Sequence, residues 1–352
     1  MHTNDDDPFA DAARQLLAEH CTPAVVRAIE AAGRAAPETA ALWQHLEAAG
    51  LPDALLPESL DGAGLTLAQA FGVLEQCGAH VLPLPLAETM LARALLASAG
   101  VARPLGSIAL ARGTQLPDGG LRCALVRSGA VADAVLVQTA DAWRLLSVPA
   151  AQAGPQALAL DAALAWSAAP PPVAPFSALA GDAGADADMD VDTLHAAVLA
   201  PQMAGALMAV FQRTLQFANE REQFGRPIGK FQAIQHQLAV MGEHVFAARM
   251  AAQLGCSGSG ADGSRPERLR VATAKARCSQ AALEVAQAAH AIHGAIGFTE
   301  ECDLQLFTRR LHGWRQAAGS ESFWHDVAGR ALLAHDGPTL DVLRRITDVA
   351  TI

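Results

Sequence analysis

Residues 219–232 read NEREQFGRPIGKFQ, and this stretch joins two segments that both carry helical patterns. Before it, residues 200–218 place apolar side chains at helical spacing. After it, apolar residues recur three and four positions apart, namely Phe231, Ile234, Leu238, Met241 and Val245, which is the pattern of an amphipathic helix. Gly225 and Pro227 should stop the first helix, because proline lacks the amide hydrogen and biases its predecessor away from helix. The stretch is therefore predicted to be a turn between two long helices.

Two residues of this turn carry hydrogen-bonding groups. Arg221 is predicted on the last turn of the first helix, and Gln232 at the start of the second. The arginine fork can donate to phosphate or carbonyl oxygens. It can also simply complement the negative end of a helix dipole. From the arginine alone, the dipole interpretation is favoured.

Composition limits the partners and the compartment. The chain has 352 residues, enough for two or three domains, and 51% of them are hydrophobic. Its net charge of −11 argues against a nucleic-acid partner, because phosphate binding needs a basic surface. The six cysteines form no CxxC pair and follow no recognisable signal peptide, so we expect free thiols in the cytoplasm. The most apolar run, 81–99, contains prolines and charges and is not expected to span a membrane.

Three blocks follow one another along the chain. Residues 1–102 read as helices separated by Pro, Gly and Asp turns. Residues 103–186 read as a short β domain, with a strand over 121–127 and a hairpin over 132–148. Residues 187–352 are predicted to be helical again. The expected fold is mostly α with a central β domain.

A metal centre is not expected. His290, His293 and Cys302 are close in sequence and suggest ligands. Metal sites usually need three or four ligands of suitable spacing, and the Ala-rich helix around His290 favours packing. We therefore predict no metal.

Three motifs, in order, resemble the acyl-CoA dehydrogenase family. Residues 221–232 look like its RxQFGxPIxxFQ signature, and residues 292–300 resemble its xHGGxGFTxE segment. Arg309 and Arg310 fall where that family carries a basic pair, and residues 56–65 resemble its PExxGGxGL turn. The chain is most similar to short members of the family, including subunits of heteromeric enzymes that act on steroid side chains.

The resemblance implies a fold, a cofactor and a reaction. The fold would be a helical domain, a β-barrel-like sheet domain and a four-helix bundle. The cofactor would be FAD, and the residues carried over as its contacts are Arg221, Gln223, Phe224, Gln232, Gly294 and Ser320. The reaction would be α,β-dehydrogenation of an acyl-CoA thioester, with the flavin supplying the redox chemistry. Implied partners are the acyl-CoA substrate, an electron-transfer flavoprotein or similar acceptor, and further subunits in a dimer or tetramer.

The chain departs from the family at four places. Ala291 stands for a common glutamine, and Ala295 for the second glycine of the loop. The acidic segment that covers the flavin in the family's β domain is not found. The largest departure is Ala318, which stands where many members carry the glutamate base, and a methyl group cannot accept a proton.

Other groups near these positions are candidates for part of the missing role. The backbone N–H of Ala318 can still donate to a thioester carbonyl. His195, which lies 26 residues before Arg221, matches an alternative position of the base in some members, and histidine can act as a base near neutral pH. The competing interpretation is that His195 is a packed or solvated helix residue. Glu321 more plausibly favours the positive end of a helix start.

Three interpretations therefore remain open. The chain is a working FAD-dependent enzyme with a relocated base, or a subunit whose partner supplies the glutamate. Alternatively, it is a non-catalytic structural or oligomerisation member of the family.

Overall fold

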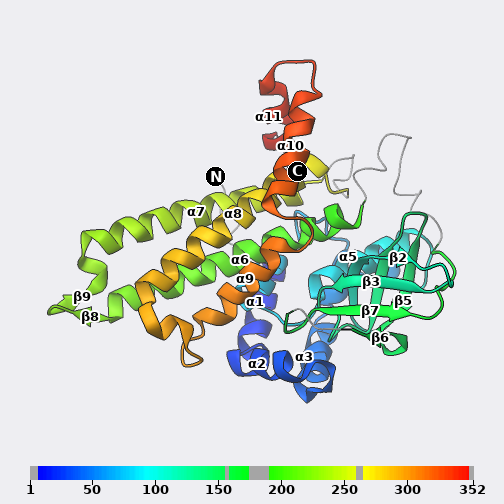
Figure 1. Ribbon diagram of the computed structural model, residues 1–352, viewed down its shortest axis with the longest axis horizontal. Helices are drawn as coiled ribbons and strands as arrows, with labels where there is room; N and C mark the ends of the chain where they lie inside the picture. The colour runs from blue at the N-terminus through cyan, green and yellow to red at the C-terminus, as the bar shows by residue number, and fades with distance from the viewer. Residues whose placement is uncertain (1–6, 155–157, 174–189, 259–264, 349–352) are drawn as a thin grey trace.

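The computed structural model describes residues 7–154, 158–173, 190–258 and 265–348. Three parts follow in chain order: N-terminal helices, two small sheets and a set of long helices (Figure 1). The predicted fold class, mostly α with a central β domain, is confirmed. The predicted domain boundary between 186 and 187 lies outside the described residues.

The N-terminal part contains helices α1 (Pro8–His20), α2 (Pro23–Ala32), α3 (Pro37–Ala48), α4 (Phe71–Ala79) and α5 (Leu86–Ser98). Each of the first three begins with a proline, where a missing amide hydrogen costs nothing. Helix α5 is almost wholly buried and nevertheless carries Arg93, 1% exposed. Arg93 donates to Asp53 Oδ1 at 2.9 Å and to Glu47 Oε1 at 2.6 Å, which ties α5 to α3 and to the segment that follows it.

The β part forms two sheets around a core of their own. One sheet has the order β1 (Ile108–Arg112), β4 (Ala134–Gln138), β5 (Trp143–Ser147). The other has the order β2 (Thr114–Gln115), β3 (Leu121–Val126), β7 (Ala162–Trp166), β6 (Gln152–Ala153). The predicted hairpin is present as antiparallel β4 and β5. The predicted strand over 121–127 is β3, but it pairs with β2 and β7 in the other sheet.

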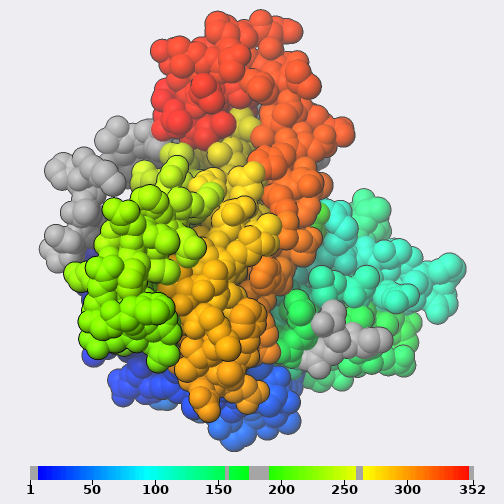
Figure 2. Space-filling model, turned by 60° about the vertical axis from the view of Figure 1, so that its left-hand side comes forward, coloured from blue at the N-terminus to red at the C-terminus, as the bar shows by residue number. Residues whose placement is uncertain are grey.

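The C-terminal part contains helices α6 (Val191–Glu220), α7 (Gln232–Cys256), α8 (Arg268–His293), α9 (Leu304–Gln316), α10 (Glu321–Leu333) and α11 (Thr339–Thr347). Helices α7 and α8 lie side by side on one face, and α10 and α11 rise beyond their upper end (Figure 2). Helix α6 is the central core helix. By length and composition it is the one helix of the described residues that could cross a membrane, and 83% of its most apolar window is buried inside the protein.

Two glycines bring α4 and α6 into close contact. A Cβ atom at Gly78 would lie 1.7 Å from the Gln202 carbonyl oxygen, and one at Gly205 would lie 1.9 Å from that of Glu75. Only glycine lets the two backbones approach this closely, because any side chain there would meet backbone atoms that cannot move aside. This crossing fixes the N-terminal helices against α6.

The turn that opened the sequence analysis differs in detail from its prediction. Helix α6 begins at Val191, runs through Pro201 and ends at Glu220, so it stops before Gly225 is reached. Arg221 is therefore the C-cap residue rather than part of the last turn. The turn is a small hairpin of β8 (Glu222–Gln223) and β9 (Arg226–Pro227), and Gln232 begins α7 as predicted.

Candidate active site

The first group of predicted site residues lies at the exposed end of α6, which we call the tip and define as residues 221–232 together with Gly294. Phe224 is 92% exposed and has a φ of 54°, a conformation that L-residues rarely adopt. The hairpin is held by its backbone, since Ile228 N–H donates to the Arg221 carbonyl at 2.8 Å. The side chains of Arg221, Gln223 and Gln232 are therefore free to face outward, and all three residues are exposed.

Gly294 reaches the same end of the molecule from another helix. It is the C-cap of α8, with a φ of 66°, and no atom lies within 4 Å of where its Cβ would be. The preceding residue, His293, stacks on Phe217 of α6 with ring centroids 4.3 Å apart. Phe217 in turn accepts the Arg221 N–H on its carbonyl at 2.8 Å. Packing thus joins the two motifs that the sequence keeps 60 or more residues apart.

The second group lies between α9 and α10, at Ala318, Gly319 and Ser320. Ala318 also has a positive φ, 51°, and its carbonyl accepts the Trp324 indole N–H at 2.8 Å. Ser320 is the N-cap of α10, where its hydroxyl accepts the Phe323 N–H at 3.5 Å. Glu321 is the first residue of that helix, as predicted, and its carboxylate pairs with Arg315.

A buried lysine holds this turn from below. Lys275 is fully buried and donates to the Gly319 carbonyl at 2.9 Å, the Arg315 carbonyl at 3.1 Å and the Ser279 hydroxyl at 3.0 Å. Burial lowers the pKa of Lys275 to about 7. All three ammonium hydrogens have acceptors, so the lysine positions the backbone of the Ala318 turn.

His195 lies near the other end of α6, in a buried cluster that we call the junction and define as Glu88, Arg127, His195 and Trp314. His195 Nε2 is 3.3 Å from Glu88 Oε1, without the alignment of a hydrogen bond, and Arg127 Nη1 is 3.8 Å from the same oxygen. The Arg127 guanidinium lies over the Trp314 ring, 4.7 Å from its centroid. One residue from each part of the chain thus meets here, with α9 adding the tryptophan.

Charge sets the protonation of this cluster. Burial alone would raise the pKa of Glu88, but its contacts with His195 and the charge of Arg127 outweigh burial and lower that pKa to about 2. Burial lowers the pKa of Arg127 to about 10, so the guanidinium stays charged at neutral pH. Sequence reasoning missed Glu88 as a site residue. A charge inside an otherwise apolar helix was the available signal, because a buried charge needs a partner.

The tip and the junction are far apart within one chain. Arg221 follows His195 by 26 residues, and an α-helix rises about 1.5 Å per residue, which gives roughly 40 Å between them. The structure therefore groups Arg221, Gln223, Phe224, Gln232 and Gly294 at one place and leaves His195, Ala318 and Ser320 elsewhere. No single-chain arrangement brings His195 to the tip.

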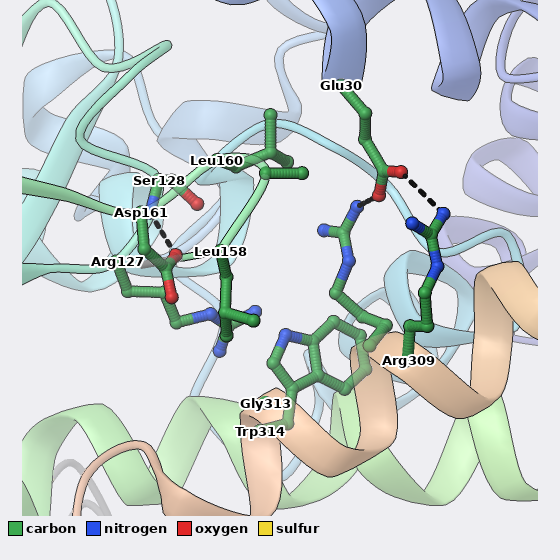
Figure 3. Close-up of a pocket in the computed structure, with 11 residues that line it drawn as sticks. Glu30, Arg127, Ser128, Leu158, Leu160, Asp161, Arg309, Gly313 and Trp314 are labelled. Atoms are coloured by element: carbon green, nitrogen blue, oxygen red, sulfur yellow. Dashed lines mark hydrogen bonds and ion pairs between the residues drawn. The ribbon is translucent and has the colours of Figure 1, made fainter. Parts of the chain in front are cut away.

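The two regions differ in whether they fit FAD. The tip offers an arginine fork, two amide side chains and open space above two glycines, Gly225 and Gly294, which suits a phosphate-bearing group. The junction opens on a pocket of about 80 Å³ (Figure 3). One benzene ring occupies a cavity of about 150 Å³, so the three fused rings of a flavin do not fit that pocket.

The histidines near Gly294 are used in packing. His290 Nε2 is 2.9 Å from the Thr308 hydroxyl, and His293 Nδ1 is 2.8 Å from the Ala289 carbonyl. Within the described residues, no group of three or more His, Cys, Asp or Glu side chains could hold a metal ion.

Comparison with known proteins identifies the scaffold. Residues 3–102 match the model of the acyl-CoA dehydrogenase N-terminal domain, and residues 182–333 that of the C-terminal domain. The chain belongs to the acyl-CoA dehydrogenase family of oxidoreductases. One relative is the acyl-CoA dehydrogenase IpdE2 of Mycobacterium tuberculosis, 32% identical over 306 residues, which cover 86% of this chain and 89% of that protein.

Two solved structures share the fold. One is the ChsE4–ChsE5 complex from Mycobacterium tuberculosis, with a TM-score of 0.80, 22% identity and coverage of 96% of this chain and 99% of the other. The second is a variant of the Tcur3481–Tcur3483 steroid ACAD, with a TM-score of 0.77, 25% identity and coverage of 93% and 97%.

Proposed function

We propose that this chain takes part in FAD-dependent α,β-dehydrogenation of an acyl-CoA thioester, as one subunit of an assembly whose partner subunit supplies the catalytic base. The observation that carries the proposal is the exposure of the tip. Five residues of the flavin signature gather at one end of the molecule and face outward, and Phe224 is 92% exposed there. Because these residues form only one exposed side of a cofactor site, a second chain is needed to cover the cofactor.

The tip would hold the cofactor in three ways. The Arg221 fork suits the phosphates, and the Gln223 and Gln232 amides can hydrogen-bond neighbouring polar groups. Gly294 lets the cofactor approach the α8 end closely, since nothing lies within 4 Å of its Cβ position. When bound, FAD accepts the β-hydrogen of the substrate as hydride. Phe224 would exclude water from that contact.

Removal of the α-proton needs a base that this chain lacks at Ala318. The turn there still presents a backbone held by Lys275 at 2.9 Å. Because this turn lies away from the tip of its own chain, its N–H would donate to the thioester carbonyl of a substrate whose flavin is held by the tip of another subunit. In the alternative with a relocated base, His195 would have to leave Glu88 and become accessible, because it is 7% exposed. We therefore place the base on the partner.

Two further features support an assembly and a compartment. Helix α7 exposes Val240, Phe246 and Met250, which are 52%, 56% and 46% accessible, and exposed apolar patches commonly mark interfaces. We propose a dimer or tetramer that passes its electrons to an electron-transfer flavoprotein or similar acceptor.

Cytoplasmic localisation is proposed from the six free cysteines, of which five are buried.

The decisive experiment compares the chain alone with a complex. The chain would be purified by itself and together with a family member that has glutamate at the position of Ala318, and bound flavin would be measured by absorbance. We expect flavin bleaching by acyl-CoA only in the complex. Arg221→Ala should lower flavin retention at least tenfold, because it removes a charged fork worth about 1.5–3 kcal/mol. Arg14→Ala, at another exposed arginine, is the matched control.

Other outcomes select the other interpretations. Bleaching by the lone chain that disappears in His195→Ala would establish a relocated base. A complex that keeps full flavin and activity after both Arg221→Ala and Phe224→Ala would reduce this chain to a structural subunit.

A further inference from the structure

A second pocket, separate from the tip, opens where the three parts of the chain meet (Figure 3). Its walls come from α2, from the connection between β3 and β4, from the segment before β7 and from α9. The lining includes Glu30, Arg127, Asp161, Arg310 and Trp314. Its volume is about 80 Å³.

Two buried donors in this pocket have no hydrogen-bond partner. Arg127 is 8% exposed and Trp314 is 2% exposed. Trp314 Nε1 has no hydrogen bond, and neither has Arg127 Nη1, which lies 3.8 Å from Glu88 Oε1. The indole nitrogen of Trp314 faces the side of the pocket where the Arg127 guanidinium lies (Figure 3). Both groups can only donate, and an unpaired buried donor costs about 1–3 kcal/mol. The pocket is therefore built for an acceptor.

The lining also carries a charge. Arg309 and Arg310 share Glu30, at 3.2 Å and 2.6 Å, so that trio keeps one positive charge. Asp161 accepts the Ser128 N–H at 3.1 Å, and its charge, after that of Glu88, raises the pKa of Arg127 against the effect of burial. Glu88 stands behind Arg127 outside the lining, at 3.8 Å and without a hydrogen bond. Three arginines thus face two carboxylates in the lining and a third, Glu88, behind it, so the unpaired donors rather than an excess of charge select the ligand.

Size and shape narrow the ligand. The volume of about 80 Å³ is roughly half of the ~150 Å³ that accepts benzene, so only a few atoms fit. Leu158 and Leu160 make one wall apolar. Ser128, also in the lining, has a φ of 57°, and backbone strain of this kind clusters at ligand sites. A planar carboxylate on a short apolar stem meets all three conditions and matches the arginine fork.

We propose that this pocket binds a carboxylate group through the N–H groups of Arg127 and Trp314. Two sources present the same chemistry, a free small carboxylate and the far end of a dicarboxylic acyl-CoA substrate. Only the second source rests on the proposed function. The pocket lies away from the tip, so its occupancy can be tested without flavin.

The first test uses nuclear magnetic resonance on the full chain. The indole N–H signal of Trp314 and the methyl signals of Leu158 and Leu160 would be followed during titration with sodium acetate, with sodium chloride at equal ionic strength, and with acetone. Acetone has the shape of acetate without its charge. We expect saturable shifts with acetate and at least tenfold weaker binding of acetone. Equal shifts from both, or no saturable shift, would mean a pocket that holds only water and would overturn the proposal.

Two variants test whether acetate binding depends on the N–H groups of Trp314 and Arg127. Trp314→Phe keeps an aromatic ring and removes the N–H, and it should weaken acetate binding about tenfold, as expected for one hydrogen bond to a charge. Trp43→Phe is the matched control, because its indole N–H bonds Glu47 at 3.1 Å in another part of the chain. Arg127→Lys keeps the charge without the fork and should also weaken binding. Unchanged affinity in both pocket variants would contradict the assignment.

A second arm separates the two sources. Succinyl-CoA and butyryl-CoA would be added while the same Leu158 and Leu160 methyl signals are followed. Shifts from succinyl-CoA alone would identify the far carboxylate of an acyl substrate, whereas shifts from acetate and neither thioester would identify a free carboxylate. Either result supports the pocket. Flavin retention at the tip is measured separately, so failure of one proposal leaves the other standing.

Discussion

The tip and the junction lie at opposite ends of α6. The polar side chains of the tip are exposed, whereas those of the junction are buried. At the tip, Arg221, Gln223 and Gln232 are exposed, and Phe224 is almost fully in solvent. At the junction, Glu88, Arg127 and His195 are each less than 10% exposed, and Arg127 and His195 each place a nitrogen within 4 Å of Glu88 Oε1. Helix α6 thus has one exposed end, which a partner subunit can cover, and one buried end, where charged side chains face one another beside the pocket of about 80 Å³.

The free-energy cost of an unpaired polar group therefore differs between the two regions. Exposed polar groups at the tip lose little when they are unpaired, since water satisfies them. Buried charges at the junction must satisfy one another, because desolvation of a lone ion is far more costly. We therefore expect substitutions at the tip to change flavin binding with little effect on stability, and substitutions that remove a charge at the junction to lower stability.

The largest expected effect is at the junction. Arg127→Met should lower the free energy of unfolding by about 3–5 kcal/mol, because it leaves Glu88 buried without its cation. Arg221→Met at the tip should change it by less than about 0.5 kcal/mol, as is usual for surface sites. Urea denaturation of the purified chain measures both. Equal losses in the two variants would erase the distinction between the regions.

The sequence predicted the tip better than the junction for a physical reason. Residues 221–232 form a local turn whose glycine, proline and flanking helices are adjacent in the chain, so local rules apply to them. Glu88, Arg127 and His195 come from three separate parts, and their meeting depends on how the parts pack. In the sequence, Glu88 is only a charge that interrupts an apolar run.

In the sheets too, pairings between neighbouring segments are predictable from the sequence and pairings between distant segments are not. The β4–β5 hairpin follows from a short turn, and it was predicted. The pairing of β3 with β7 joins residues about 40 apart, such as Cys123 with Leu164, and no local pattern shows it. Strands β2 and β6 have two residues each, too short for a periodic pattern to mark them.

Low pH should weaken the junction by protonating Glu88. The pKa of Glu88 falls from 4.5 to about 2 on folding. The carboxylate therefore stabilises the fold fully above pH 4.5, and this contribution, about 3 kcal/mol at 1.36 kcal/mol per pKa unit, is lost as pH falls toward 2. Glu88→Gln should remove this pH dependence. Unfolding free energies from pH 5 to pH 2.5 measure it.

An exposed carboxylate provides the control for that titration. Asp326 on α10 is 59% exposed at its side chain, so Asp326→Asn should leave the acid profile as it is in the parent chain. If Glu88→Gln and Asp326→Asn gave the same profile, the charge cluster at the junction would have no part in acid stability.

The smallest expected effect is a change in stability at two residues with strained backbones. These are Phe224 at the tip and Ala318 in the turn held by Lys275. Their φ values are 54° and 51°, and a left-handed conformation costs an L-residue about 1–2 kcal/mol. Glycine relieves this cost but also gains freedom when unfolded, so Phe224→Gly and Ala318→Gly should each stabilise the chain by up to about 1 kcal/mol. Thermal denaturation measures the gain. The two variants should then differ in the complex, where Phe224→Gly loses flavin and Ala318→Gly retains it. Flavin loss in both, or in neither, would contradict the assignment of cofactor contact to the tip.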